Sequence, residues 1–412
     1  MERIHERCAG LDVHKDTVVA SLHVPGEAGE RHREVRTFGT TTAELLTLAD
    51  WLMAHRVTHA AIESTGVYWK PVFHVLESVC EVVLVNPAHV KALPGRKTDV
   101  QDCEWLAQLL EHGLVRGSFV PPTPIRELRD LTRYRKTLIQ QRAAEANRVQ
   151  KLLEDANIKL GSVASDVLGV SGRAMLWALI EGERDGARLA ALAQGALRKK
   201  TAALAAALTG CFTAHHGFLL RQILSHIDEL EQHVATCNLR IEEQLRPFEA
   251  ELTRLQTIPG VGRRTAEVIV AEIGIDMGQF PTAAHLASWA GVCPGHDESA
   301  GKRRSGRTRK GNRWLRGTLI EASWGAMRSR DTYLAALFRR IMRRRGAKKA
   351  AVAVAHSTLV AVWHMLKHGV DYHELGPSHF DQIRTEQLIR HHLRRLGDLG
   401  LKVTVETSGA AA

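Results

Sequence analysis

The N-terminal part of the chain alternates between short apolar runs and amphipathic stretches, and this alternation constrains the fold most. The runs typical of strands are 8–13, 17–24, 33–38, 58–63 and 81–85, and the stretches typical of helices are 42–55, 68–79 and 99–112. Strands that alternate with helices are the mark of an α/β domain, in which helices cover a sheet. The proline-rich residues 121–124 close this domain as a linker.

Four acidic residues lie at or near the ends of these segments. Asp12 lies near the end of the first strand and Glu63 ends the fourth, while Asp99 and Asp102 open a helix. The last two are three residues apart and therefore share one helix face. Mg²⁺ prefers carboxylate oxygens, and a two-metal phosphodiester site needs several that converge. Each residue alone could be a solvated or capping side chain, but together they predict a metal site for phosphate chemistry.

The charge balance points to an anionic partner. The chain of 412 residues carries 56 Lys and Arg against 45 Asp and Glu, a net charge of +11. Nucleic acid is the simplest partner for such a chain. No apolar run approaches the length of a membrane span and the N-terminus lacks a signal-peptide core, so we expect no membrane partner and a cytoplasmic location. The six cysteines show no zinc-binding spacing and are expected to be reduced thiols.

Two long amphipathic helices are expected beyond the linker, at 125–160 and 215–245, with shorter helices at 162–208 between them. The first long helix could form a coiled coil with another subunit or pack on its own chain, and its pattern fits both. A further apolar helix is expected at 350–366.

Residues 255–266 resemble the helix-hairpin-helix element of many DNA-binding proteins. Gly260 and Gly262 permit a tight turn, and Arg263 opens the next helix. The N-terminus of that helix could hold a phosphate, which would position a duplex without reading its bases. The alternative is an ordinary glycine-rich turn between two helices.

A strongly basic stretch follows. Residues 299–349 hold 17 Lys and Arg and only two acids, and apolar residues at helical spacing indicate a folded basic face rather than a tail. Phosphate contacts from such a face make binding strongly dependent on salt. The cations that we expect to contact nucleic acid are Lys302, Arg303, Arg304, Arg307, Lys310, Arg313 and Arg316.

Seven motifs, in order along the chain, carry a resemblance to a known family. They are GLDVHK at 10–15, IESTGVY at 62–68, NPAHVK at 86–91, KTDVQD at 97–102, IPGVG at 258–262, SWAGVCPG at 288–295 and ESAGKRRSGRTRKGNRWLR at 298–316. In these motifs the chain resembles transposases of the IS110/IS1111 insertion-sequence family, from Gly10 to about Gly369. The run at 298–316 is the most specific.

The resemblance implies an RNase H-like (RuvC-like) N-terminal domain whose DEDD acidic tetrad binds Mg²⁺ or Mn²⁺. It assigns those roles to Asp12, Glu63, Asp99 and Asp102. It also implies a nucleophilic serine a few residues after a G-x-x-P motif, which here is Ser299, with Ser305 as the alternative. The implied partners are double-stranded donor and target DNA, a bridge RNA encoded by the element, and further copies of the chain, as a dimer or tetramer.

The predicted domains are a RuvC-like domain at 1–120, a helical linker or coiled-coil region at 121–250, a mainly helical transposase domain at 251–345 and a helical extension and tail at 346–412. The predicted activity is cutting and rejoining of DNA strands by serine attack, near the bacterial nucleoid. A Holliday-junction resolvase or nuclease that uses water is the alternative. A catalytically silent DNA- or RNA-binding protein is a third possibility, and four mutually repelling carboxylates argue against it.

Overall fold

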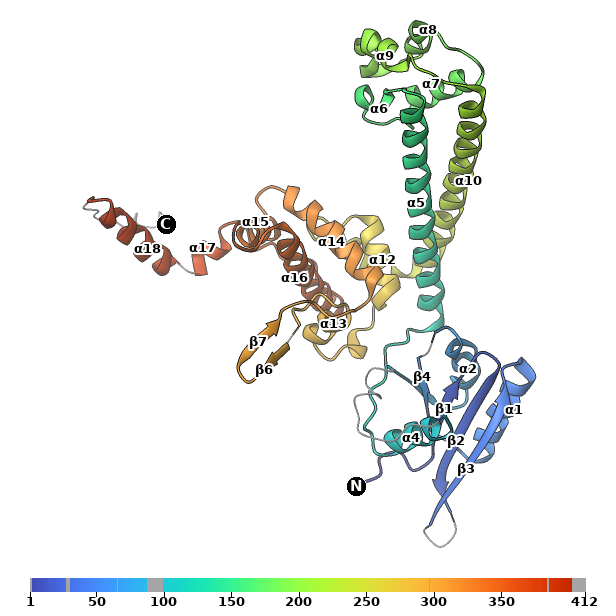
Figure 1. Cartoon of the computed structure of the whole chain (residues 1–412). Helices are drawn as coiled ribbons and strands as arrows, with labels where there is room; N and C mark the ends of the chain where they lie inside the picture. Colours follow the sequence, from blue (N-terminus) through green and yellow to red (C-terminus); the bar gives the residue numbers. More distant parts are fainter. Residues whose placement is uncertain are drawn as a thin grey trace. The chain divides into compact units, whose positions relative to one another are not determined.

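The computed structural model of the protein describes residues 2–26, 30–64, 66–86, 99–295, 297–383 and 385–401. The chain divides into two compact units, Met1–Val120 and Pro121–Ala412, whose elements are labelled in Figure 1. The motif at 86–91, apart from Asn86, and the first two residues of the motif at 97–102 lie outside the described residues. The finer division of the second unit into three domains remains a prediction.

The first unit is built on one five-stranded sheet. Its strands are β1 (Cys8–Val13), β2 (Thr17–Pro25), β3 (Arg31–Gly39), β4 (His59–Glu63) and β5 (Glu81–Val85), in the order β3-β2-β1-β4-β5. The first three strands are antiparallel neighbours, while β1, β4 and β5 are parallel. The expected strands are confirmed to within about two residues at each end. This mixed sheet is consistent with the expected RNase H-like domain.

Helices cover both faces of this sheet (Figure 1). They are α1 (Thr42–Ala54), α2 (Trp69–Leu76) and α4 (Asp99–Glu111). Side chains of α1 and α2 share one buried cluster with Ala9, Leu11 and Val13 of β1. The opposite face of the sheet, which includes Cys8 of β1, packs against Leu106 and Leu110 of α4 in a second cluster. The side chains of β1 therefore alternate between two helical layers, as those of a central strand do.

The second unit begins with α5 (Thr123–Asp155), which packs alongside α10 (Ala214–Leu245) of the same chain (Figure 1). Arg142 of α5 is 2.7 Å from Glu231 of α10, and Gln244 of α10 donates to Glu127 of α5 at 3.3 Å. Early residues of one helix thus meet late residues of the other, so the pair is antiparallel. Of the two alternatives for the first long helix, packing on its own chain is the one that this structure contains.

Four shorter helices join α5 to α10 and share a buried core with them. They are α6 (Leu160–Val163), α7 (Val170–Ile180), α8 (Gly186–Ala191) and α9 (Thr201–Leu208). The chain continues through α11 (Glu249–Leu255), α12 (Arg263–Ile273), α13 (Ala283–Trp289), the hairpin of β6 (Asp297–Ser299) and β7 (Lys302–Ser305), α14 (Arg313–Arg328), α15 (Tyr333–Arg345), α16 (Ala347–His368), α17 (His379–Ile383) and α18 (Thr385–Asp398).

Helix α16 corresponds to the apolar helix expected at 350–366. By length and composition alone it could span a membrane, although no unbroken apolar run marks it in the sequence. Half of its most apolar window is buried, and it packs against α13, α14 and α15. These contacts are those of a core helix.

Candidate functional site

Asp12 and Glu63 lie side by side at the carboxyl ends of two parallel strands. Leu11 of β1 pairs with Ile62 of β4, and the two acids are the next residues of their strands. Because side chains alternate along a strand, Asp12 lies on the same face as Gly10, and Glu63 on the same face as Ala61. Ala61 packs in the α4-side cluster. Both carboxylates are therefore on the face of the sheet that α4 covers.

Helix α4 touches β1 backbone to backbone at Gly10. A Cβ atom on Gly10 would lie 2.2 Å from the carbonyl oxygen of Cys103 and 2.4 Å from the amide nitrogen of Ala107. One turn further along the helix from Cys103, the thiol of Cys8 faces the carbonyl oxygen of Ala107 at 3.7 Å. The helix thus runs antiparallel to β1, and its first turn approaches the strand end that bears Asp12.

The first turn of α4 carries the other two predicted acids. Asp102 is half-buried, and Asp99 is the first residue of α4, although its side chain lies outside the described part. The carboxylate of Asp12 is 20% exposed and lies 3.1 Å from Nε2 of His14. We call Asp12, Glu63 and Asp102 the acidic edge. Its hard oxygen donors are the kind that Mg²⁺ and Mn²⁺ prefer, so the residue types fit the implied metal.

Cys103 lies beside the acidic edge and is inert. Burial raises the pKa of its thiol to about 11, and the negative charges of Glu104 and Asp12 add to the shift. The thiol is therefore protonated at neutral pH, and the thiolate rather than the thiol is the metal ligand and the nucleophile. Cys103 is a buried free thiol on α4.

In the second unit, glycine contacts hold the base of the β6–β7 hairpin. Gly291 has a φ of +72°, and a Cβ on Gly311 would lie 2.4 Å from its amide nitrogen. The amide of Gly295 donates to the carbonyl oxygen of Arg307 at 3.2 Å. The segments before and after the hairpin are therefore clamped together at the level of the backbone, with Pro294 of the G-x-x-P motif inside the clamp.

Ser299 is the last residue of β6 and pairs with Lys302 across a two-residue turn. Both turn residues have positive φ, +50° at Ala300 and +73° at Gly301, which is the pattern of a type I′ hairpin. Ser299 therefore adjoins the hairpin tip, although its side chain lies outside the described part. The hydroxyl of Ser305, the alternative, is half-buried and accepts a hydrogen bond from the amide of Arg307 at 3.1 Å.

The predicted DNA-contacting cations lie on this hairpin, in the loop after it and at the start of α14. We call residues 302–316 the basic segment. Lys302, Arg307, Lys310 and Arg313 are exposed and Arg316 is half-buried, while the side chains of Arg303 and Arg304 lie outside the described part. Exposed cations on a loop can follow a phosphate backbone without a fixed pocket.

The two glycines of the predicted helix-hairpin-helix element have different surroundings. A Cβ on Gly260 would lie 2.4 Å from the carbonyl oxygen of Ala322, so Gly260 packs against α14. Gly262 precedes α12, no side chain caps that helix, and a Cβ there would have no atom within 4 Å. A ligand such as a phosphate therefore has space at Gly262, before the first turn of α12, but not at Gly260.

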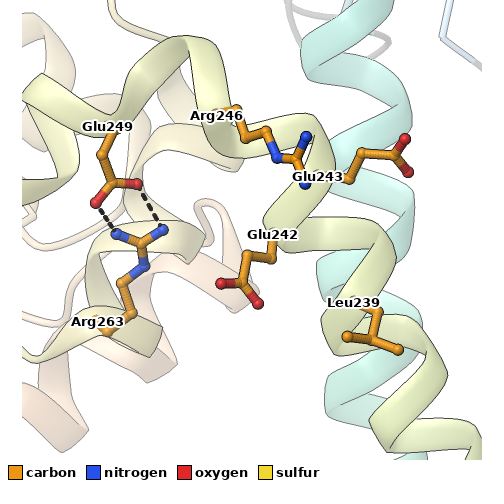
Figure 2. Close-up of a pocket in the computed structure, with 6 residues that line it drawn as sticks. All are labelled: Leu239, Glu242, Glu243, Arg246, Glu249 and Arg263. Carbon is orange, nitrogen blue, oxygen red and sulfur yellow. Dashed lines mark hydrogen bonds and ion pairs between the residues drawn. The ribbon is translucent and has the colours of Figure 1, made fainter.

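Arg263, the first residue of α12, is held by an acidic neighbour. Its Nη2 donates to Oε2 of Glu249 at 2.8 Å as one half of a two-bond pair (Figure 2). Glu242 and Glu243 line the same small cavity. The charge of Arg263 is thus partly neutralised within the chain, whereas the cations of the basic segment named above are mostly exposed. Its predicted contact with nucleic acid stays a prediction.

Sequence reasoning missed two buried carboxylates on α12. Glu272 accepts two hydrogen bonds from Arg133 of α5, at 2.7 and 2.8 Å, and one from Asn312 at 2.5 Å. Asn312 in turn caps α14 directly after the basic loop. Glu267 pairs with Arg135 of α5 at 2.6 Å. The signal was present, since both acids interrupt the apolar run at 266–273, where an unpaired charge would be costly.

Comparison with known proteins supports the expected family. Residues 9–158 match the family model DEDD_Tnp_IS110, described as a transposase, and residues 252–339 match the transposase IS116/IS110/IS902 family. The first match contains all of the predicted acidic residues, and the second contains the β6–β7 hairpin and the basic segment.

Two similar proteins also come from insertion elements. An uncharacterized 43.6 kDa protein of insertion element IS110 from Streptomyces coelicolor is 29% identical over 164 residues, which is 37% of this chain and 40% of that protein, less than two thirds of its length. The transposase for insertion sequence element IS1111A from Coxiella burnetii is 23% identical over 291 residues, covering 69% of this chain and 70% of that protein. The chain therefore belongs to the IS110 family of transposases.

Proposed function

We propose that this chain cuts and rejoins the DNA strands of an insertion sequence. The observation that supports the proposal is that Asp12 and Glu63 lie at the carboxyl ends of neighbouring parallel strands, and that the first turn of α4, which bears Asp102, approaches the same strand end. Carboxylates placed together repel one another, and a bound cation relieves the repulsion. The chain also presents an exposed basic segment, which suits a phosphate backbone.

The residues that would hold Mg²⁺ or Mn²⁺ are the three acids of the acidic edge and Asp99. Such an ion, when bound, would neutralise charge that develops on a phosphate. The contact of His14 with Asp12 restrains the Asp12 carboxylate. The packing of α4 against Gly10 fixes the position of the helix backbone that bears Asp102. These contacts preorganise the acids, which is what such a site requires.

Ser299 is the proposed nucleophile. Its hydroxyl oxygen would attack the scissile phosphorus, forming a serine–phosphate ester and breaking the bond to one sugar oxygen, which leaves. The ester keeps the phosphate activated for rejoining to another strand, by the same reaction in reverse. Its place beside the hairpin tip favours Ser299, because the Ser305 hydroxyl already accepts a backbone hydrogen bond.

The partners follow from the same residues. Lys302, Arg307, Lys310 and their neighbours would contact the phosphates of donor and target DNA, and the open start of α12 at Gly262 would hold another phosphate. A bridge RNA encoded by the element would supply the sequence specificity. The acidic edge belongs to the first unit and Ser299 to the second, so we propose that a tetramer brings the acidic edge of one subunit to the serine of another.

Covalent trapping tests this proposal. The full chain, a transcript of the element's non-coding end, Mg²⁺ and end-labelled donor and target DNA are mixed, denatured and run on a gel. We expect a labelled protein–DNA adduct that disappears in Ser299→Ala and persists in Ser305→Ala. The reverse pattern moves the nucleophile to Ser305. Strand cleavage without an adduct in any variant would instead support a nuclease that uses water, since the acidic edge alone suffices for that chemistry.

A further inference from the structure

Two histidines and a glutamate meet on the first unit, away from the acidic edge. His32 and Glu34 belong to β3, the edge strand, and His55 follows the last residue of α1. One ligand atom from each of the three lies within 4.8 Å of the others. The strand β2 separates β3 from β1, which bears Asp12, so this cluster and the acidic edge are different places.

The strand places the first two ligands together. His32 and Glu34 are two residues apart and therefore lie on one face of β3. Nε2 of His32 is 3.6 Å from Oε2 of Glu34, and the side chains are 49% and 28% exposed, so an ion could reach them. The ring of His55 lies nearly parallel to that of His32, at an angle of 12° and with their centroids 6.3 Å apart.

The third ligand is already oriented. Nδ1 of His55 lies 2.8 Å from the carbonyl oxygen of Trp51, one turn back in α1. A carbonyl oxygen can only accept, so Nδ1 carries the proton and Nε2 keeps its lone pair. Metal-binding histidines almost always donate their second ring nitrogen to a carbonyl or carboxylate in this way, which fixes the tautomer. This contact is independent of the clustering itself.

The carboxylate is also restrained. Oε1 of Glu34 accepts a hydrogen bond from Nε of Arg36 at 2.6 Å, which leaves Oε2 facing His32. The guanidinium of Arg36 stacks on the ring of Trp51 at 5.3 Å, so Arg36 is held in place as well.

We propose that His32, Glu34 and His55 bind a zinc-class divalent ion, with Zn²⁺ as the best fit. Two imidazoles and one carboxylate, with a position left for water, are a known zinc ligand set. Ligand atoms at about 2.0–2.2 Å from Zn²⁺ lie about 3.3–3.6 Å from one another. The contact between His32 and Glu34 already has this spacing, and the ligand atom of His55 lies within 4.8 Å of both.

The ion would tie the edge strand β3 to the end of α1 and so stabilise the first unit. Imidazole ligands select zinc-class ions, whereas carboxylates and water suit Mg²⁺. The two sites should therefore discriminate between ions, with Mg²⁺ failing to displace Zn²⁺ from the histidines. This expectation holds whether or not the chain is a recombinase.

The test is calorimetric titration of the metal-free full chain with Zn²⁺ in excess Mg²⁺, near neutral pH. Exposed thiols are alkylated first, because Cys211 is exposed and thiolates bind zinc. We expect one tight site whose zinc affinity falls more than about tenfold in His32→Ala, His55→Ala and Glu34→Gln. Mutation of residues that only hydrogen-bond to metal ligands already lowers metal affinity about 10–100-fold, and loss of a ligand should cost at least as much. Asp12→Ala and Asp102→Ala should keep it.

The matched control is His59→Ala. His59 lies 3.2 Å from Glu81, and its ring is 3.9 Å from that of His5, so it belongs to a second histidine–carboxylate group on the same unit. Zinc affinity should not change in this variant. Loss of the tight site in His59→Ala with retention in His32→Ala and His55→Ala overturns the proposal, as does the absence of any tight site in the wild type.

Thermal unfolding provides a second readout. Zn²⁺ should raise the Tm of the wild-type chain and leave that of His55→Ala unchanged, because an ion that binds only the folded state stabilises it. An equal rise in both proteins would contradict the assignment. Circular dichroism of the metal-free variants shows whether each one folds.

Discussion

The acidic edge and the basic segment are held in different ways. The acids lie on strand ends and on a helix whose backbone touches β1 at Gly10, and the described carboxylates are partly buried. The basic segment is exposed and is clamped only at its base, by Gly291 against Gly311 and by Gly295 against Arg307. Chemistry on a phosphate needs rigid placement, whereas contact with a phosphate backbone tolerates motion. Small changes in the acidic edge should therefore lower strand cleavage sharply. Single substitutions in the basic segment should weaken DNA binding only gradually.

Removal of one acid should have the largest effect. We expect Asp102→Asn to lower strand cleavage more than about 100-fold, because even outer partners of a metal site are worth about 10–100-fold. DNA affinity should stay near that of the wild type, since the assigned DNA contacts lie elsewhere. Gel assays of cleavage and of binding measure the two quantities.

The matched control for this change is Glu104→Gln. Glu104 is exposed on the same helix, two residues further on and hence on another face, so cleavage should persist. An equal loss in both variants would mean that charge on α4, rather than the acidic edge, matters. Normal cleavage with weakened binding in Asp102→Asn would overturn the role of Asp102.

The backbone contact at Gly10 comes next. Gly10→Ala should destabilise the first unit by about 1–3 kcal/mol, as overpacking does, because the new methyl would meet α4 backbone at 2.2 Å. Hydrogen exchange of peptides from 99–111 should report the loss, and cleavage should fall with it. Gly117→Ala is the control, since its Cβ would meet only a Val83 methyl at 3.4 Å. Unchanged exchange in Gly10→Ala would show that α4 is held less firmly than we infer.

The far end of α4 is anchored by charge. Glu111 contacts Arg3, His23 and Arg31 within 3.3 Å and its side chain is 3% exposed. Burial alone would raise the pKa of Glu111, but the hydrogen bond from His23 and the charges of the arginines bring it below its usual value. A carboxyl group with a lowered pKa contributes stability above its unfolded pKa, and that contribution is lost as the pH falls through the folded value.

Glu111→Gln should therefore lower the free energy of unfolding by about 1.5–3 kcal/mol at neutral pH, the range for hydrogen bonds to charged groups. The difference in stability between this variant and the wild type should shrink once the pH falls below the pKa of an ordinary glutamate, about 4.3. Hydrogen exchange of the first unit across this pH range measures the deficit. A deficit that is constant with pH would assign the effect to packing instead.

Single cations of the basic segment should have the smallest effect. Arg307→Ala should lower DNA affinity a few-fold and reduce the slope of log affinity against log salt by about 1, as loss of one phosphate contact does. Arg263→Ala should change the slope less, because Glu249 already holds that guanidinium. Equal slopes for the two variants would show that the ion pair opens on DNA.

The sequence predicted the strands of the first unit and the place of Asp12 and Glu63 at strand ends, because period-two alternation locates those ends. It could not predict that the backbone of α4 packs directly against β1 at Gly10. A single glycine in a strand does not show which element lies against it. The apolar stripe of α5 was equally suited to a helix of another subunit, so its partner α10 stayed undecided. The apolar helix expected at 350–366 corresponds to α16, but the sequence could not show that α13, α14 and α15 pack against it.

The central claim is that the acidic edge of one subunit and Ser299 of another act on the same phosphate. Subunit mixing tests it most directly. The Asp102→Ala and Ser299→Ala chains are each assayed for the covalent protein–DNA adduct, alone and after mixing with RNA and both DNAs. We predict no adduct from either alone and recovery in the mixture, on the Asp102→Ala chain. No recovery from variants that bind DNA normally, or an adduct on Ser299→Ala alone, would contradict it.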